Sequence, residues 1–420
     1  MAKFIINGGK KLSGEICVGG AKNNAQIMLP VSLLSSETIT ISNLPLIDGV
    51  EKSLDLLTDL GAEINRNNHE VSINTSKVSK TTLDPKVADK FRTSVMFVGP
   101  LLARYGKVSF PHPGGCVIGA GGRPIDLFLE GFIALGAKVE IANNYYNITA
   151  PELKGANYFF STVSVTGTQS LLMTACLAKG ETLLQNCAME PEIKALADYL
   201  NTQGAKIEGA GTPNIKISGV NKLKAGKCKI IPDRIETGSF ALMAAATSSE
   251  LTIKNCEPSH ILNLLTIFKK IGVNFEQGED WIKINKSPNI IAYNIKTHEY
   301  PGFPTDLQSP YVVLMTQAKG SCLVQESIYD RRLIWTDMLS QMGANVIMCD
   351  PHRVVINGPS KLSGKKLISP DIRAGIALVI AALVADGKTE IDNIYQIDRG
   401  YENLDERLRL IGADIIRIEE

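Results

Sequence analysis

Residues 169–186 read QSLLMTACLAKGETLLQN, and the order of residue types in this stretch decides the fold. Its first half is apolar on nearly every side and rich in small residues, which predicts a buried helix. A lysine-glycine pair then marks a turn, and the last six residues are typical of a strand. The stretch therefore predicts a buried helix that leads through a tight turn into a strand.

The same phrase recurs along the chain, and a second phrase alternates with it. Further copies of the first occupy residues 24–43, 94–110, 239–255, 309–326 and 375–392. The second phrase is an amphipathic helix, a glycine and a short strand. Its glycines lie 68 to 75 residues apart, at Gly61, Gly136, Gly204, Gly272, Gly343 and Gly412. We expect glycine to end both kinds of helix, as it commonly does at C-caps.

The repeats account for the whole chain as six units of about seventy residues. Two helices and several strands are too many for one rung of a solenoid. The pattern therefore predicts pseudo-symmetric α/β domains in which sheets wrap around the apolar helices. Three units per domain would give two lobes, and we expect the ligand in the cleft between them.

Composition excludes several classes of protein. The 420 residues carry a net charge of +1, so no overall field attracts nucleic acid or an acidic membrane. The apolar run at residues 376–385 is too short to span a bilayer. The eight cysteines form no C-x-x-C pair and the five histidines are scattered, which argues against zinc and against disulfides. We expect a reduced cytoplasmic protein whose cysteines, apart from Cys116, are mostly buried.

Residues 111–126, PHPGGCVIGAGGRPID, interrupt the repeat with a stretch rich in glycine and proline. Such a composition predicts an irregular loop, and long loops in compact domains are often lids or binding loops. Cys116 and Arg123 are its reactive side chains. An arginine lowers the pKa of a nearby thiol and also grips carboxylates or phosphates. A surface turn with an incidental cysteine is the alternative at this point.

Charged and polar side chains mark the expected starts of the apolar helices. They are Lys22 and Asn23, Arg92, the stretch 162–167, Asp306, and Asp371 with Arg373; Arg332 and Arg399 lie in nearby loops. Each has an ordinary alternative role: Asn23 or Asp306 as a helix cap, the hydroxyls of 162–167 as caps, and the lysine and arginines as solvated surface groups. If these helix starts converge, however, they form a cationic pocket suited to a small phosphorylated carboxylate.

Several longer motifs in the chain resemble those of a known protein family. They are residues 8–23, the PGGC of 113–116, SVTGT at 164–168, PDRIETG at 232–238, FPTDLQ at 303–308, DIRAG at 371–375 and QIDRGYE at 396–402. With these motifs the chain closely resembles the enolpyruvyl transferases that act on UDP-N-acetylglucosamine. The resemblance covers essentially the whole chain. It implies a two-domain inside-out α/β barrel of six β-α-β-α-β-β repeats, with residues 22–232 in one domain and residues 1–21 plus 233–420 in the other.

The resemblance also implies an activity. Enzymes of this kind transfer the enolpyruvyl group of phosphoenolpyruvate to the 3-hydroxyl of UDP-N-acetylglucosamine and release phosphate. The reaction is an addition followed by an elimination through a tetrahedral ketal, at the start of peptidoglycan precursor synthesis. It implies no metal and no organic cofactor. We therefore expect a cytoplasmic monomer that binds two small molecules and neither nucleic acid nor membrane.

Roles for single residues follow only by position within the family motifs. Cys116 matches the loop cysteine that protonates the methylene carbon or forms a covalent adduct. Asp306 matches the proposed base on the sugar hydroxyl. The resemblance also places Lys22 and Arg399 with Cys116 and Asp306 in the catalytic set. The binding and supporting matches fall into three groups: Lys22, Asn23, Arg123 and Arg399 on phosphoenolpyruvate; Asn23, Arg92, Arg123, Ser164, Val165, Gly167, Asp306 and Ile328 on the sugar nucleotide; and Arg332, Asp371 and Arg373 as supporting polar residues.

Two departures from the family pattern leave alternatives open. Two extra residues separate Cys116 from Arg123, and Thr162 stands where many members have lysine. A non-catalytic sugar-nucleotide-binding paralogue is one alternative, and a purely structural repeat protein is another. The sister enzyme that makes 5-enolpyruvylshikimate 3-phosphate shares the fold and the donor, but it lacks the PGGC loop.

Overall fold

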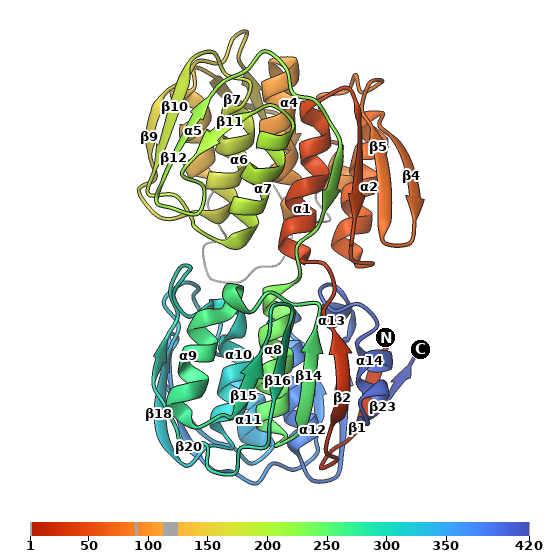
Figure 1. Ribbon diagram of the computed structural model, residues 1–420, viewed down its shortest axis with the longest axis vertical. Helices are drawn as coiled ribbons and strands as arrows, with labels where there is room; N and C mark the ends of the chain where they lie inside the picture. The colour runs from red at the N-terminus through yellow and green to blue at the C-terminus, as the bar shows by residue number, and fades with distance from the viewer. Residues whose placement is uncertain (1, 89–90, 112–124, 420) are drawn as a thin grey trace. The chain divides into compact units, whose positions relative to one another are not determined.

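The computed structural model describes residues 2–88, 91–111 and 125–419. These residues divide into two compact units (Figure 1). Unit 1 holds residues 2–19 and 232–419, and unit 2 holds the described part of residues 20–231. Each unit has a hydrophobic core of its own.

Three apolar helices form the centre of unit 1: α8 (Arg234–Ala246), α10 (Thr305–Met315) and α12 (Ile372–Val384). Every residue of α8 is buried. Helix α10 packs against both of the others. Small residues permit the close packing: a Cβ on Gly238 would lie 2.4 Å from the side chain of Leu307. Such a helix, apolar all round, is stable only inside a core.

Three four-stranded sheets surround these helices, in the orders β21-β22-β1-β23, β15-β16-β14-β2 and β17-β18-β20-β19. Each contains one parallel pair; in the second sheet Ile253 pairs with Ile16 in parallel and with Ile282 in antiparallel register. The strands are β1 (Lys3–Asn7), β2 (Ser13–Cys17), β14 (Glu250–Lys254), β15 (Phe275–Gln277), β16 (Trp281–Ile284), β17 (Ile295–Lys296), β18 (Gly320–Gln325), β19 (Asn345–Asp350), β20 (Arg353–Gly358), β21 (Lys366–Ile368), β22 (Lys388–Asp392) and β23 (Asp414–Ile418). Shorter helices complete the unit: η3 (Pro258–Ile261), α9 (Leu262–Ile271), α11 (Thr336–Gln341), α13 (Tyr395–Asp398) and α14 (Leu404–Leu410).

Unit 2 repeats this plan. Its sheets have the orders β13-β3-β5-β4, β11-β12-β10-β9 and β6-β8-β7. The inner helices are α1 (Lys22–Val31), continued by η1 (Ser32–Leu34), α4 (Val98–Tyr105), preceded by η2 (Arg92–Phe97), and α6 (Val165–Ala175). The others are α2 (Asp48–Leu60), α3 (Pro85–Ala88), α5 (Asp126–Ala134) and α7 (Pro191–Thr202). The strands are β3 (Thr38–Ser42), β4 (Glu63–Asn67), β5 (Glu70–Asn74), β6 (Lys107–Pro111), β7 (Lys138–Ala142), β8 (Tyr145–Thr149), β9 (Asn157–Phe159), β10 (Glu181–Gln185), β11 (Lys206–Glu208), β12 (Asn214–Ser218) and β13 (Lys227–Lys229).

The predicted fold of six α/β repeats, with sheets outside and apolar helices inside, is confirmed. All six repeat glycines have a positive φ, from 83° at Gly272 to 103° at Gly61. An L-residue adopts this conformation at a cost, which explains glycine at these helix ends. The expectation that glycine also ends every apolar helix is wrong. Helix α8 ends at Ala246, its C-cap is Thr247, and Ser248 has a positive φ of 53°.

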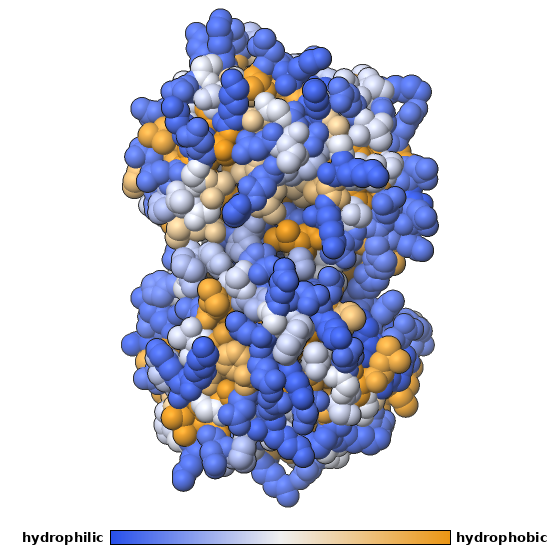
Figure 2. Space-filling model, viewed as in Figure 1, coloured by the Kyte–Doolittle hydropathy of each residue, from blue (hydrophilic) through white to orange (hydrophobic). Residues whose placement is uncertain are grey.

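Polar side chains cover most of the face seen in Figure 2, with apolar ones scattered among them. This distribution follows from the strands, which alternate buried and exposed residues: β22, for example, buries Thr389 and Ile391 and leaves Lys388 exposed. Among the residues that the structure describes, no helix is both long enough and apolar enough to cross a membrane.

The cysteines only partly match the expectation of burial. Cys176, Cys187, Cys256 and Cys322 are buried and Cys228 is half-buried, but Cys17 and Cys349 are exposed. All seven described cysteines are free thiols. Burial raises the pKa of Cys176, the most deeply placed, to about 12. Buried thiols of this kind are chemically inert at neutral pH.

Candidate active site

Asp306 lies in the first turn of α10 and is held by two arginines. Its Oδ1 accepts a hydrogen bond of 2.6 Å from Arg332 Nη2, and its Oδ2 accepts one of 2.9 Å from Arg373 Nη2. The side chains of Arg332 and Arg373 are 4% and 8% exposed, whereas that of Asp306 is 25% exposed. The carboxylate is therefore the more accessible member of the group, and two fixed cations favour its anionic form.

Both arginines remain charged despite their burial. Burial is the largest single effect and lowers the pKa of Arg373, but the charges of Asp306, Tyr401 and Asp233 and the hydrogen bond to Asp306 together outweigh it, so the pKa is raised. The same balance raises the pKa of Arg332. The alternative role of Asp306 as a helix cap is wrong, because the N-cap of α10 is Pro304 and no side chain caps it.

Asp371 is the N-cap of α12. Its side chain accepts hydrogen bonds from the backbone N–H groups of Arg373 and Ala374 at 2.7 and 3.0 Å. This cap fixes the start of α12 and so places Arg373 near Asp306. Arg399 ends α13, and its Nη1 donates to Gln396 Oε1 at 3.0 Å.

Ile328 follows β18, and its backbone N–H donates to the carboxylate of Glu326. The sequence motifs assigned no role to Glu326, or to Thr305, which contacts it and stands within the FPTDLQ motif. The only signal was a glutamate placed directly after an apolar strand, where charged residues are rarely buried without partners.

The predicted site residues of unit 2 lie at the starts of its inner helices. Lys22 and Asn23 are the first two residues of α1, and both are half-buried. The alternative of Asn23 as an N-cap is wrong, because Ala21 holds that position. Arg92 begins η2, which leads into α4.

The stretch 162–167 caps a helix, which is the alternative role expected from the sequence for its hydroxyl groups. Ser164 is the N-cap of α6, and its Oγ accepts a hydrogen bond of 3.1 Å from the N–H of Gly167. Val165 is the first helical residue and is half-buried. Gly167 is required here, because a Cβ would lie 2.9 Å from the ring of Phe160.

Cys116 and Arg123 lie outside the described residues. The structure thus places two sets of predicted residues, one in each unit. In unit 1 it joins Asp306, Arg332 and Arg373 by direct hydrogen bonds. Within the described ranges, no three His, Cys, Asp or Glu side chains are grouped so as to hold a metal ion.

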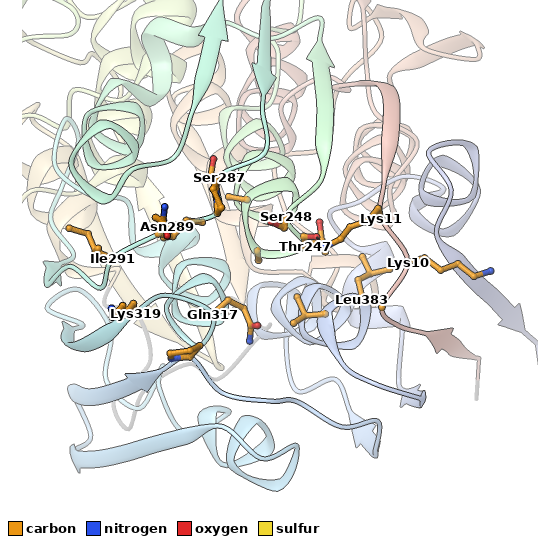
Figure 3. Close-up of a pocket in the computed structure, with 17 residues that line it drawn as sticks. Lys10, Lys11, Thr247, Ser248, Ser287, Asn289, Ile291, Gln317, Lys319 and Leu383 are labelled. Atoms are coloured by element: carbon orange, nitrogen blue, oxygen red, sulfur yellow. Dashed lines mark hydrogen bonds between the residues drawn. The ribbon is translucent and has the colours of Figure 1, made fainter.

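A hollow of about 540 Å³ lies elsewhere in unit 1, at the C-terminal ends of α8, α10 and α12 (Figure 3). None of the predicted site residues lines it. One of its lysines has a structural explanation: Lys11 Nζ donates to the carbonyl oxygen of Thr247 at 2.8 Å, and a cation stabilises a helix C-terminus. Asp306 stands at the opposite, N-terminal end of α10, so this hollow is separate from the candidate site.

Comparison with known proteins shows which family this chain resembles. A family model described as EPSP synthase (3-phosphoshikimate 1-carboxyvinyltransferase) matches residues 6–408. Two curated relatives bear the name UDP-N-acetylglucosamine 1-carboxyvinyltransferase. The one from Koribacter versatilis is 41% identical over all of this chain and 97% of its own length. The one from Desulfosudis oleivorans is 42% identical over the full length of both chains.

Solved structures agree at the level of the fold. The enolpyruvyl transferase NikO from Streptomyces tendae superimposes with a TM-score of 0.90 at 20% identity, covering 99% of this chain and 98% of NikO. EPSP synthase from Acinetobacter baumannii gives a TM-score of 0.77 at 18% identity over the full length of both chains.

Proposed function

Since the chain belongs to the enolpyruvyl transferase family, we propose that it transfers the enolpyruvyl group of phosphoenolpyruvate to the 3-hydroxyl of UDP-N-acetylglucosamine and releases phosphate. The observation that carries this proposal is the full-length identity of 41–42% to relatives named for that transfer. The family model is named for the sister reaction on shikimate 3-phosphate. The PGGC motif at residues 113–116 favours the sugar nucleotide as the acceptor.

The reaction balances as an addition and an elimination. First, the oxygen of the sugar 3-hydroxyl bonds to C2 of phosphoenolpyruvate, the hydroxyl loses its proton and the methylene carbon gains one. Then the tetrahedral ketal loses a proton from the same carbon, the bond from C2 to the phosphate oxygen breaks, and phosphate leaves. Cations fixed around the phosphate and carboxylate orient the donor and offset its changing charge. No metal or organic cofactor takes part in this scheme.

The proposal assigns the two proton transfers of the addition step to a carboxylate and a thiol. Asp306 accepts the proton of the 3-hydroxyl, and its ion pairs with Arg332 and Arg373 support this role because they keep the carboxylate anionic and oriented. Cys116 supplies the proton to the methylene carbon or forms a covalent adduct. Its assignment rests on the sequence motif.

The remaining assignments concern substrate binding. Lys22, Asn23, Arg123 and Arg399 hold phosphoenolpyruvate, and Asn23, Arg92, Arg123, Ser164, Val165, Gly167 and Ile328 contact the sugar nucleotide. Asp371 supports the site through its cap on α12. The finer proposal is a cytoplasmic, monomeric enzyme of peptidoglycan precursor synthesis.

The decisive experiment measures phosphate release from phosphoenolpyruvate with UDP-N-acetylglucosamine, with shikimate 3-phosphate, and with no acceptor. We expect release only with the sugar nucleotide. Cys116→Ser should abolish most of the turnover while the sugar nucleotide still binds, and Cys349→Ser, at an exposed cysteine, serves as the matched control. Sugar-nucleotide binding without release by the unaltered chain would instead support a non-catalytic paralogue, and release with shikimate 3-phosphate would support the sister reaction.

A further inference from the structure

We infer that Glu326 is a positioning residue for Asp306: it holds Arg332 through the hydroxyl of Thr305, and Arg332 in turn holds the carboxylate of Asp306. The inference rests on the proposed function, in which Asp306 takes the proton of the sugar hydroxyl. Glu326 itself touches neither substrate in this scheme.

Glu326 is a fully buried acid. It directly follows β18 and is 0% exposed. Its backbone N–H donates to the carbonyl oxygen of His352 at 2.8 Å, which anchors its main chain to the neighbouring turn. Burying a carboxylate costs free energy unless donors compensate for the lost water. The position of Glu326 therefore needs an explanation in its partners.

The two carboxylate oxygens have different partners. Oε1 accepts three hydrogen bonds, from Thr297 Oγ1 at 3.0 Å, from the N–H of Ile328 at 2.8 Å and from the N–H of Tyr329 at 3.1 Å. This oxygen fixes the turn that carries Ile328. Oε2 accepts one hydrogen bond, from Thr305 Oγ1 at 2.8 Å. This second oxygen faces the candidate site.

Thr305 connects Glu326 to the arginine. A carboxylate only accepts hydrogen bonds, so the hydroxyl hydrogen of Thr305 must point at Glu326. A lone pair of the same oxygen then faces Arg332, whose Nη1 donates to it at 2.7 Å. The other terminal nitrogen of Arg332 donates to Asp306 Oδ1 at 2.6 Å. The negative charge of Glu326 thus fixes the direction of the whole chain of hydrogen bonds.

The charges in this group balance. Two anions, Glu326 and Asp306, face two buried cations, Arg332 and Arg373. Burial lowers the pKa of Arg332, but the charges of Asp306, Glu326 and Tyr329 and the hydrogen bond to Asp306 together outweigh this effect, and the pKa is raised. Without the charge of Glu326 the group carries one excess positive charge, which makes the carboxylate of Asp306 a weaker base.

Two conservative variants break the hydrogen bond between Glu326 and Thr305, one by changing the acceptor and the other by removing the donor. Glu326→Gln keeps an oxygen for Ile328 and Tyr329 but presents an N–H to Thr305. Thr305→Val keeps the shape of the side chain and removes the hydroxyl. We expect each to lower kcat about tenfold or more, with the KM for UDP-N-acetylglucosamine changed less than about twofold. Because both break one chain, the double variant should be no slower than the slower single variant.

Thr305→Ser is the matched control, since it keeps the hydroxyl and should keep kcat within about twofold. Glu326→Ala should also raise the KM for UDP-N-acetylglucosamine, because the turn at Ile328 loses its acceptor.

Unchanged kcat in Glu326→Gln and Thr305→Val, or losses that multiply in the double variant, would overturn the inference. So would a lower thermal midpoint with normal kcat per folded molecule. An inactive unaltered chain would instead overturn the proposed function, and the inference with it.

Discussion

At the scale of single residues, Asp306 shows how its surroundings define a role. A carboxylate in the first turn of a helix is ordinarily a cap or a favourable partner of the helix dipole. Here both oxygens of Asp306 are taken by guanidinium groups from different segments, Arg332 and Arg373. The carboxylate is fixed and anionic, yet a quarter of its side chain remains accessible. These properties suit a base that acts on a bound hydroxyl.

Replacement of this base gives the first prediction. Asp306→Asn keeps the shape but removes the charge, so kcat should fall by about 10²–10⁴, the usual contribution of general base catalysis. The free energy of unfolding should fall by about 1–3 kcal/mol, because the donors of two buried arginines lose their charged acceptor. Steady-state kinetics and urea unfolding measure the two effects. Asp337→Asn, in the exposed first turn of α11, is the control; an active Asp306→Asn enzyme would remove Asp306 from the mechanism.

The raised pKa values of the buried cysteines predict which thiols react at pH 8. Burial raises the pKa of Cys176, Cys187 and Cys256 to about 12 and that of Cys322 to about 11, so these groups stay as unreactive thiols at pH 8. In a Cys116→Ser background, a thiol reagent should label Cys17 and Cys349 in the native protein and all seven remaining cysteines after unfolding. Mass spectrometry of the labelled peptides identifies the sites. Rapid native labelling of Cys176 would show that the core opens.

At the scale of elements, helix starts combine structural and candidate functional roles. Ser164, Asp233 and Asp371 each accept backbone N–H groups at the start of an inner helix. The first residues of the helix then take fixed directions, and for α12 the second of these residues is Arg373. A cap in this fold therefore also positions a side chain of the candidate site.

Asp371 tests this dual role. Asp371→Ala should lower the free energy of unfolding by about 1 kcal/mol, since two backbone donors lose their acceptor. Asp371→Ser, which retains a capping oxygen, should recover most of that loss and most of the activity. Denaturant unfolding and kcat measured on the same samples separate the effects. A large fall of kcat in Asp371→Ser at normal stability would mean that the carboxylate contacts a substrate directly.

At the scale of the whole molecule, the chain builds one design twice. Each unit has three inner helices, three sheets and its own cluster of buried apolar residues, and the two clusters share no residue. The described residues of unit 2 all lie between residues 20 and 231, whereas unit 1 takes residues 2–19 from the start of the chain and its other described residues from residue 232 onward. Strand β2 joins the sheet of unit 1 by parallel pairing with β14.

This organisation predicts that residues 20–231 fold alone. A separate core of this size supports a cooperative domain. The isolated segment should show a single thermal transition and a helix and strand content, by circular dichroism, that matches its share of the full chain. It should have no transferase activity, because Asp306 and Arg399 belong to the other unit. A segment that lacks a cooperative transition would show that unit 1 is needed for unit 2 to fold.

The sequence by itself determined the repeats and hence the fold. Apolar helices such as residues 239–246 have no polar face, so only burial between sheets satisfies them. Each repeat glycine marks a left-handed helix end, which few other residues adopt readily. Patterns of this kind depend on neighbours within a few positions in the chain, and a single sequence displays them directly. The family motifs added the candidate substrates and the residue roles.

Only the tertiary structure decided which charged groups meet. Asp306, Arg332 and Arg373 are up to 67 residues apart in the chain, and no local pattern predicts their hydrogen bonds. The same holds for Glu326, whose burial appears only when β18 is placed in its sheet and Thr305 is brought beside it. The free energy of a buried charge depends on all its neighbours in space. The roles of Asp306 and Glu326 therefore depend on the packing of distant segments and not on the residue type alone.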